Sequence, residues 1–186
     1  MKRLFFRSWI LLLFMVLLIS CHQTNEPTVD PIPETITNPK EIYASYIDCL
    51  SGVYENLSSV ILKRENRKKE TYTINDYYHE TYTNEDNNDT EFYSTAALSS
   101  DNVIIQITLS GYSYGNTSLN EEQGIISIDI LAPEHTTYTV ETSIIHSGDK
   151  LYLKDEKTQA YICVLQKGVG IIYLEDNAGH TWNALR

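Results

Sequence analysis

Apolar residues recur at spacings of three and four positions along the stretch that follows Asn38. Asn38 is a suitable capping residue, and Pro39 occupies the first helical position, where proline is favoured. At about 100° per residue, the apolar side chains fall within a stripe about 140° wide. This pattern predicts one long amphipathic helix over residues 39–65. Its apolar stripe contains Tyr43, Ile47, Leu50, Tyr54, Leu57 and Ile61.

The rest of the chain alternates between apolar and polar residues with a period of two. Such alternation, interrupted by clusters of turn residues, is typical of antiparallel strands joined by short loops. Strands are expected near 71–83, 90–98, 103–112, 124–131, 136–146, 150–154, 160–166, 170–175 and 180–184.

Together these elements predict an α+β fold in which one long N-terminal helix packs on a meandering antiparallel sheet or partly closed barrel. The predicted domain spans residues 39–186, a length that supports a single hydrophobic core.

The first residues follow a different pattern, in which Lys2, Arg3 and Arg7 flank or precede an apolar run that ends at Ile19. This run is too short to span a bilayer comfortably, since a membrane-spanning helix needs about 20 apolar residues. The run is followed by Ser20-Cys21. Residues 1–20 resemble a bacterial lipoprotein signal peptide, whose Leu-x-small-Cys pattern matches Leu18-Ile19-Ser20-Cys21.

The resemblance implies that Cys21 is lipidated, for example with palmitate, and becomes the N-terminus of a protein held on the cell envelope. Several acyl chains, at about 0.8 kcal/mol for each buried methylene group, anchor a protein stably. His22 follows Cys21, where lipoproteins retained in the inner membrane of enteric-type bacteria carry aspartate, so the outer membrane is favoured. Its periplasmic and surface faces both stay open. An ordinary secretory signal with an unmodified Cys21 is the alternative.

Residues 21–38 include three of the five prolines and no aromatic residue. Such a composition predicts a flexible tether between the lipidated cysteine and the folded domain.

Removal of the signal segment leaves 11 Lys and Arg against 25 Asp and Glu, a net charge of −14. Nucleic acid is therefore excluded as an expected partner. The few basic residues cluster, and they could contact an anionic surface such as lipid headgroups. The favoured alternative is that they complement the end of the predicted helix and pair with acidic residues of the sheet. The cluster consists of Lys63, Arg64, Arg67, Lys68 and Lys69.

Cys49 and Cys163 are the remaining cysteines, and they are the one candidate pair for a disulfide within the chain. An envelope compartment outside the inner membrane permits such a bond. Closing so long a loop would be worth about 4–5 kcal/mol in the chain-entropy model. The alternative, two free and buried thiols, stays open.

The residues Gly111-Tyr112-Ser113-Tyr114-Gly115 match the G-x-S-x-G pattern of the α/β-hydrolase nucleophile elbow. That motif needs a helix directly after the serine, whereas residues 116–123 are almost entirely polar and precede another expected strand. A turn within the sheet is therefore predicted, and a small serine hydrolase that uses Ser113 is kept as a minor alternative.

No other residue pattern predicts catalysis, a metal site or a cofactor. The five histidines lack the spacing of metal ligands. The acidic stretch 84–91 lacks the glycine and the final glutamate of a calcium loop, so a hairpin tip is expected. The carboxylate pairs Glu121-Glu122 and Asp155-Glu156 fall in expected loops or turns and have no mark of a glycosidase pair.

These observations favour a non-catalytic, lipid-anchored envelope protein that binds a protein or glycan partner. One alternative is an inhibitor or immunity lipoprotein directed against a lysozyme-like or protease effector, because a net charge of −14 suits a cationic enzyme.

Replacing Cys21 with alanine tests the anchor. We expect the Cys21→Ala variant to remain as an unprocessed precursor or to leave the membrane fraction, because it lacks the acceptor for the acyl chains. Mass spectrometry and membrane fractionation measure both outcomes. An unchanged mature mass and an unchanged membrane partition would show that Cys21 is not the lipidated residue.

Overall fold

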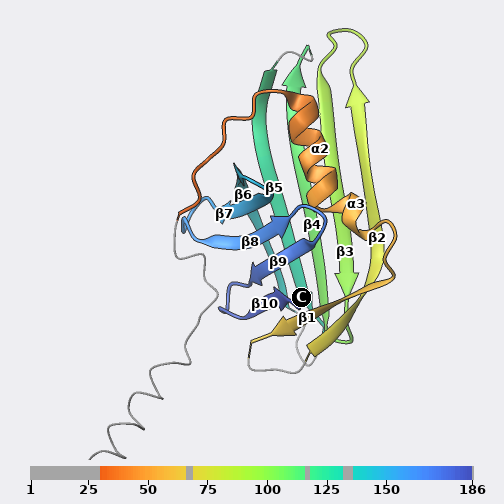
Figure 1. Cartoon of the computed structure of the whole chain (residues 1–186), viewed down its shortest axis with the longest axis vertical. Coiled ribbons are helices and arrows are strands. Elements are labelled where there is room, and N and C mark those ends of the chain that lie inside the picture. The colour runs from red at the N-terminus through yellow and green to blue at the C-terminus, as the bar shows by residue number, and fades with distance from the viewer. Residues whose placement is uncertain (1–29, 66–68, 116–117, 132–135, 186) are drawn as a thin grey trace, which may run out of the picture. The chain divides into compact units, whose positions relative to one another are not determined.

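Ten antiparallel strands close into a barrel in the computed structural model, which describes residues 30–65, 69–115, 118–131 and 136–185 (Figure 1). The compact unit begins at Pro31. Around the barrel the strand order is β1-β10-β9-β8-β7-β6-β5-β4-β3-β2, so neighbours in sequence are neighbours in space except at the closing pair. Within the described part of the chain, no helix has the length and apolar character needed to cross a membrane.

The helical segments among the described residues are short and precede the strands. They are α2 (Pro39–Cys49) and α3 (Ser51–Tyr54). The strands are β1 (Ser59–Arg64), β2 (Lys69–Thr83), β3 (Thr90–Ser99), β4 (Val103–Tyr114), β5 (Ser118–Ile130), β6 (Thr136–Ser147), β7 (Lys150–Asp155), β8 (Tyr161–Gln166), β9 (Gly170–Glu175) and β10 (Thr181–Ala184).

The predicted α+β fold, with one long helix over 39–65 packed on a sheet or partly closed barrel, is wrong. The described chain is mostly β-structure, and its barrel is closed. The helix start was placed correctly, since Asn38 caps α2 by accepting a hydrogen bond from the Lys40 backbone N–H at 3.1 Å. The helix, however, ends at Cys49 and α3 adds one further turn.

The predicted helix was too long because the same residues also fit a strand. Leu50 leaves the helical conformation, with φ −132° and ψ −91°, and Ser59–Arg64 then forms β1. In β1, Leu62 and Arg64 are buried, whereas Ile61 is exposed, which is the alternation of a strand. Val60 and Ile61 are β-branched residues that favour strands, although their spacing from Leu57 also suits a helix.

The strands expected after residue 70 all form, although their ends differ. The largest difference is at β5, which begins at Ser118 because its polar first half pairs with the end of β4. The register between β4 and β5 shifts between Tyr112 and Ser113, so one extra residue of β5 is accommodated there.

Strand β1 closes the barrel because it pairs with β10 on one side and with β2 on the other. The Trp182 indole N–H of β10 donates a hydrogen bond of 2.8 Å to the Tyr72 hydroxyl of β2, across β1. The Arg64 guanidinium of β1 lies 5.0 Å from the centre of the Trp182 ring. Trp182 and Tyr72 are fully buried, so this seam is part of the core.

Helices α2 and α3 pack on the inner face of the long strands (Figure 1). Ser94 of β3 connects them: its hydroxyl donates to the Tyr46 carbonyl at 3.1 Å and accepts from the Ser51 backbone N–H at 3.1 Å. Tyr54 reaches the opposite wall, where its hydroxyl accepts from the Ile171 backbone N–H at 3.1 Å. Gly170 permits this approach, because a Cβ at that position would lie 2.4 Å from the Tyr54 hydroxyl and the residue has φ +82°.

Part of the segment that we expected to be a tether contacts the barrel. The Glu34 backbone N–H donates to the His146 carbonyl at 2.8 Å, and the Gly148 backbone N–H donates to the Glu34 carboxylate at 2.5 Å. The chain between Pro31 and Asn38 is therefore fastened to the β6–β7 hairpin before α2 begins.

Cys49 and Cys163 are free thiols in this structure, so the candidate disulfide is not formed. The two side chains have different surroundings. Cys49 Sγ lies 4.0 Å from the Asp149 carbonyl oxygen, whereas Cys163 is fully buried beside Tyr54. Burial raises the pKa of both thiols, that of Cys49 to about 12, which leaves them protonated and weakly reactive.

Two leucines of the predicted stripe distinguish the observed fold from a long helix. Leu50 is fully buried, whereas Leu57 is 45% exposed. We expect Leu50→Asp to lower the free energy of unfolding by about 3 kcal/mol or more, because it buries an unpaired charge.

The matched change Leu57→Asp should stay within about 0.5 kcal/mol of the parent. Urea denaturation of the two variants measures both effects. Equal losses of stability would contradict the position of Leu57 outside the core.

Candidate functional site

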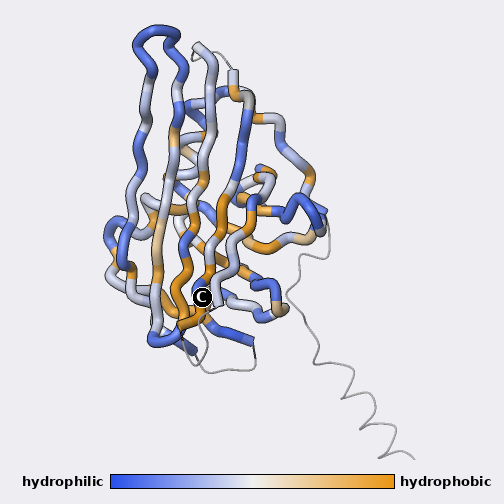
Figure 2. Tube along the Cα trace, turned by 180° about the vertical axis from the view of Figure 1, so that it is seen from behind, coloured by the Kyte–Doolittle hydropathy of each residue, from blue (hydrophilic) through white to orange (hydrophobic). Residues whose placement is uncertain are grey.

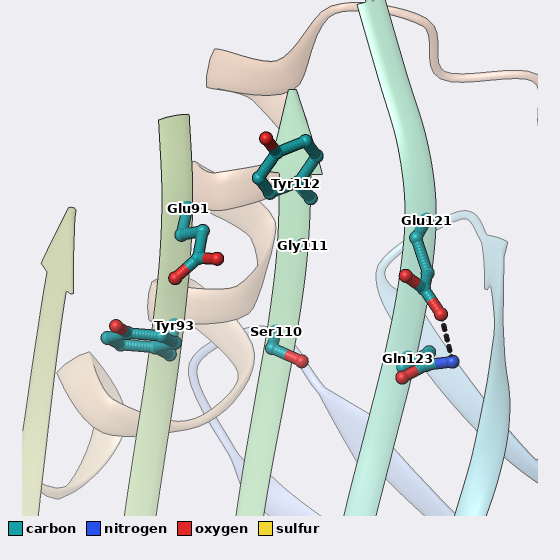
Figure 3. A pocket seen from close by; sticks show the side chains of 7 residues that line it. All are labelled: Glu91, Tyr93, Ser110, Gly111, Tyr112, Glu121 and Gln123. Carbon is teal, nitrogen blue, oxygen red and sulfur yellow. Dashed lines mark hydrogen bonds between the residues drawn. The ribbon is translucent and has the colours of Figure 1, made fainter. Parts of the chain in front are cut away.

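A groove on the outside of the barrel lies across β3, β4 and β5 and has a volume of about 250 Å³. Figure 3 shows its side chains on the side of the strands that faces away from the helices. Its polar and aromatic lining residues are Glu91 and Tyr93 on β3, Ser110 and Tyr112 on β4, and Glu121 and Gln123 on β5.

Strand alternation places these residues on the outer face. On β4, Leu109, Gly111 and Ser113 are buried toward the core, so Ser110 and Tyr112 point outward. Only glycine fits at position 111, because a Cβ there would lie 2.5 Å from the Phe92 ring on the inner side of the sheet.

The register aligns the lining residues in two rows across the strands. One row is Glu91–Tyr112–Glu121, so Tyr112 has a carboxylate on each side. The next row is Tyr93–Ser110–Gln123. Ser110 lies between Tyr93 and Gln123, and because its side chain is short, the groove is hollow at this position (Figure 3).

Tyr112 is held in place from the β2–β3 turn. Its hydroxyl donates a hydrogen bond of 2.8 Å to the Asp89 carboxylate, which also accepts from the Gly115 backbone N–H at 3.1 Å. The Tyr114 ring packs edge to face against the Tyr112 ring, with centres 4.9 Å apart. The Asp89 hydrogen bond, more than partial burial, raises the pKa of Tyr112 to about 12.

The acidic and aromatic character of the groove continues onto β2. Tyr93 has a raised pKa, caused first by burial and then by the carboxylates of Glu80 and Glu91. Figure 2 shows that the tip of the β2–β3 hairpin is strongly hydrophilic. Between residues 75 and 91 the sequence has no Lys or Arg. It has six carboxylates, those of Asp76, Glu80, Glu85, Asp86, Asp89 and Glu91.

Such a surface can bind a cation or a group rich in hydrogen-bond donors. Tyrosine rings attract cations through their faces, and carboxylates accept strong hydrogen bonds from Lys and Arg. The same side chains can stack on sugar rings and accept hydrogen bonds from hydroxyl groups.

A second cleft, of about 240 Å³, lies between α2 and the β6–β7 hairpin. His146 faces it and contacts the Glu122 carboxylate, and the Tyr46 ring stacks on His146 with centres 6.0 Å apart. Burial and the nearby Glu122 carboxylate raise the pKa of Tyr46 well above its ordinary value. At its edge Lys167 pairs with Asp48 at 2.6 Å. These contacts join α2 to the barrel, so we assign the side chains of this cleft a structural role.

Ser113, the candidate nucleophile, lies near the end of β4 and is buried. Strand β4 continues to Tyr114, and Gly115 then enters the turn with φ +56°. The Ser113 hydroxyl has no hydrogen-bond partner among the described residues. The strand, serine and helix arrangement of a nucleophile elbow is not formed by the described residues here.

The predicted basic cluster is divided by the structure. Lys63 and Lys69 are exposed and lie opposite each other on the neighbouring strands β1 and β2. Arg64 is only 8% exposed and packs on Trp182, so its guanidinium belongs to the barrel seam. Arg67 and Lys68 lie outside the described residues, as does the predicted lipidation site Cys21.

The described histidines have separate partners. His79 contacts the Ser51 hydroxyl at 3.3 Å, His146 contacts Glu122, and His180 contacts the Asp176 carboxylate at 2.9 Å. No group of three or more His, Cys, Asp or Glu side chains gathers at metal-binding distance within the described part of the chain.

In each of the two pairs of adjacent acidic residues, the two carboxylates have different surroundings. Glu121 points outward into the groove, whereas Glu122 points inward to His146. Asp155 is buried and accepts 2.7 Å hydrogen bonds from the backbone N–H groups of Lys157 and Thr158, which lower its pKa, and Glu156 is exposed.

Sequence reasoning missed the groove. Its residues come from three strands, and their alignment depends on a register that the alternation alone does not give. A usable signal was present on β3, because Glu91 and Tyr93 flank the apolar Phe92 and so fall on the face opposite to it.

Comparison of the chain with protein-family models, with curated proteins and with solved structures finds no match.

Replacing Asp89 with asparagine tests how Tyr112 is held. Asp89 favours the protonated phenol, so its neutralisation should lower the pKa of Tyr112 from about 12 toward the ordinary value of about 10. The exposed turn residue Asp86 provides a matched control, and Asp86→Asn should leave the pKa of Tyr112 unchanged. An NMR titration of the tyrosine ring signals measures both. A Tyr112 pKa that is unaffected by Asp89→Asn would contradict the hydrogen bond.

Proposed function

We propose that this chain is a lipid-anchored protein of the cell envelope that has no catalytic role and binds a protein or glycan partner. The binding site is the outer groove across β3, β4 and β5. The observation that carries the proposal is the row Glu91–Tyr112–Glu121, which presents an aromatic ring between two carboxylates on the outer face of the sheet.

The anchor follows from the resemblance of Leu18-Ile19-Ser20-Cys21 to the lipoprotein processing site. Acylation of Cys21 would hold the protein at a membrane, with the outer membrane favoured by His22. The predicted tether of residues 21–38 would join the acylated Cys21 to the barrel, although its residues from Pro31 onward belong to the compact unit.

A cationic protein fits the groove better than a neutral glycan. Six carboxylates within residues 75–91, together with Glu121, place many negative charges around the groove. Opposite charges across an interface raise the association rate and determine the partner that is selected. A glycan would use the tyrosine rings equally well, but it would gain little from this concentration of charge.

The same charge favours a second candidate function, an inhibitor or immunity lipoprotein against a cationic lysozyme-like or protease effector. After removal of residues 1–21, the chain would carry a net charge of −14. Inhibition assays with a cationic lysozyme and with a cationic protease test this candidate directly, because a binding protein of another kind would leave both activities unchanged.

Neutralising both groove carboxylates tests the proposed site. We expect the Glu91→Gln, Glu121→Gln double variant to bind its envelope partner about tenfold more weakly and with less dependence on salt, because two cation-binding groups are lost. Affinity capture from envelope extracts identifies the partner, and titration with the purified partner measures the affinity.

The double variant Glu65→Gln, Glu156→Gln removes the same charge from exposed positions that lie outside strands β2 to β6 and is the control. It should bind like the parent. If the two double variants weaken binding equally, net charge acts without the groove, and the proposed site is wrong.

A further inference from the structure

Strand β2 has a free edge next to the groove. It is the longest of the described strands, and it pairs with β1 only over Lys69–Thr73, after which the Ile74 backbone N–H donates to the Ser58 carbonyl at 3.1 Å. From Asn75 to Thr83, β3 is the only described strand that pairs with it, and each of these residues is exposed. Figure 1 shows this part of β2 along the outer margin of the sheet, beyond the end of β1.

The ladder between β2 and β3 shows which backbone groups the edge presents. The Asn84 backbone N–H donates to the Asp89 carbonyl at 2.8 Å, so Asn84 and Asp89 form a hydrogen-bonded pair. Hydrogen-bonded and non-hydrogen-bonded pairs alternate in an antiparallel ladder, and this ladder has no register shift between Asp76 and Thr83. The backbone N–H and C=O groups that point away from β3 are therefore those of Tyr77, His79, Thr81 and Thr83.

We propose that this edge binds an extended, basic segment of a partner protein as an additional strand beside β2. The inference rests on the proposed binding function and specifies the chemistry of the partner. Edge strands bind peptides in this way because the peptide backbone completes their unpaired hydrogen bonds, while alternate side chains give specificity.

The rows of the groove extend to this edge. Tyr82 lies beside Glu91 in the first row, and Glu80 lies beside Tyr93 in the second. An added strand would place its outward side chains beside Tyr82, Glu80 and Tyr78, at about 5 Å between Cβ atoms. Lys or Arg at these positions would pair with Glu80 and lie next to tyrosine rings.

Charge disfavours a second copy of this chain as the added strand. Two copies paired along β2 would bring together hairpins that each carry six carboxylates and no Lys or Arg between residues 75 and 91. Like charges on neighbouring strands are destabilising, whereas a basic strand would be attracted.

A blocked peptide of about eight alternating lysine and valine residues is a suitable probe. Fluorescence anisotropy measures its affinity for the folded protein. Thr81→Pro removes a backbone N–H that points away from β3, so the hydrogen bonds between β2 and β3 are kept. Proline is tolerated on edge strands. We expect Thr81→Pro to weaken binding at least about tenfold.

Thr81→Ala is the control, because it removes the side chain and keeps the backbone N–H. This variant should bind like the parent, and circular dichroism and thermal melting establish that both variants fold. Glu80→Gln should weaken binding and reduce its salt dependence. A glutamate–valine peptide should not bind.

Two backbone-methylated peptides provide a measurement that needs no variant. Methylation of either all lysine or all valine nitrogens blocks alternate N–H groups, so only one of the two peptides should lose affinity. An equal effect of the two methylations, or parental affinity of Thr81→Pro, overturns the proposal.

The experiments distinguish failure of the strand-addition proposal from failure of the proposed groove site. If Glu91→Gln, Glu121→Gln weakens binding while Thr81→Pro does not, the groove remains the site and strand addition is wrong. If the protein alone forms a dimer that Thr81→Pro dissociates, the added strand is a second copy, and the basic partner is wrong.

Discussion

The closure of the barrel at β1 is the constraint on which the rest of the structure depends. Six residues, Ser59–Arg64, connect the last strand to the second, and without them β2 and β10 would each have an open edge along the whole core. The Trp182–Tyr72 hydrogen bond and the Arg64 guanidinium over the Trp182 ring fix this closure with fully or nearly buried side chains. Because β1 is short, however, closure is complete at only one end of β2.

The unequal lengths of β1 and β2 determine which surfaces are accessible. Where β1 ends, the long strands continue, and α2 and α3 cover their inner face. The outer face and the edge of β2 therefore remain for a partner. Both carry tyrosines and carboxylates in rows that the register aligns, as in Tyr82–Glu91–Tyr112–Glu121. The helices thus stabilise the sheet from one side and leave the other side free to bind.

Much of the strand pattern could be predicted from the sequence, because a period of two is unambiguous over long segments such as 103–112. The helix could not be bounded in this way, since Leu57, Val60 and Ile61 continue the helical spacing, while Val60 and Leu62 also fit the alternation of a strand. Only the need for a closing strand decides between them. The groove depends on three strands in register, and the separate surroundings of Cys49 and Cys163 depend on how α2 and α3 cross the barrel, so neither follows from local pattern.

The contacts of Glu34 have a mechanical consequence. A pull on the chain from its N-terminal side reaches the hydrogen bonds of Glu34 with His146 and Gly148 before it reaches α2. The β6–β7 hairpin therefore takes up the load first, and the helix whose side chains fill the inner face of β3 and β4 is protected from it. Tension applied at that end would be borne first by β6 and β7, and β5, β4 and β3 separate these strands from the β2 edge.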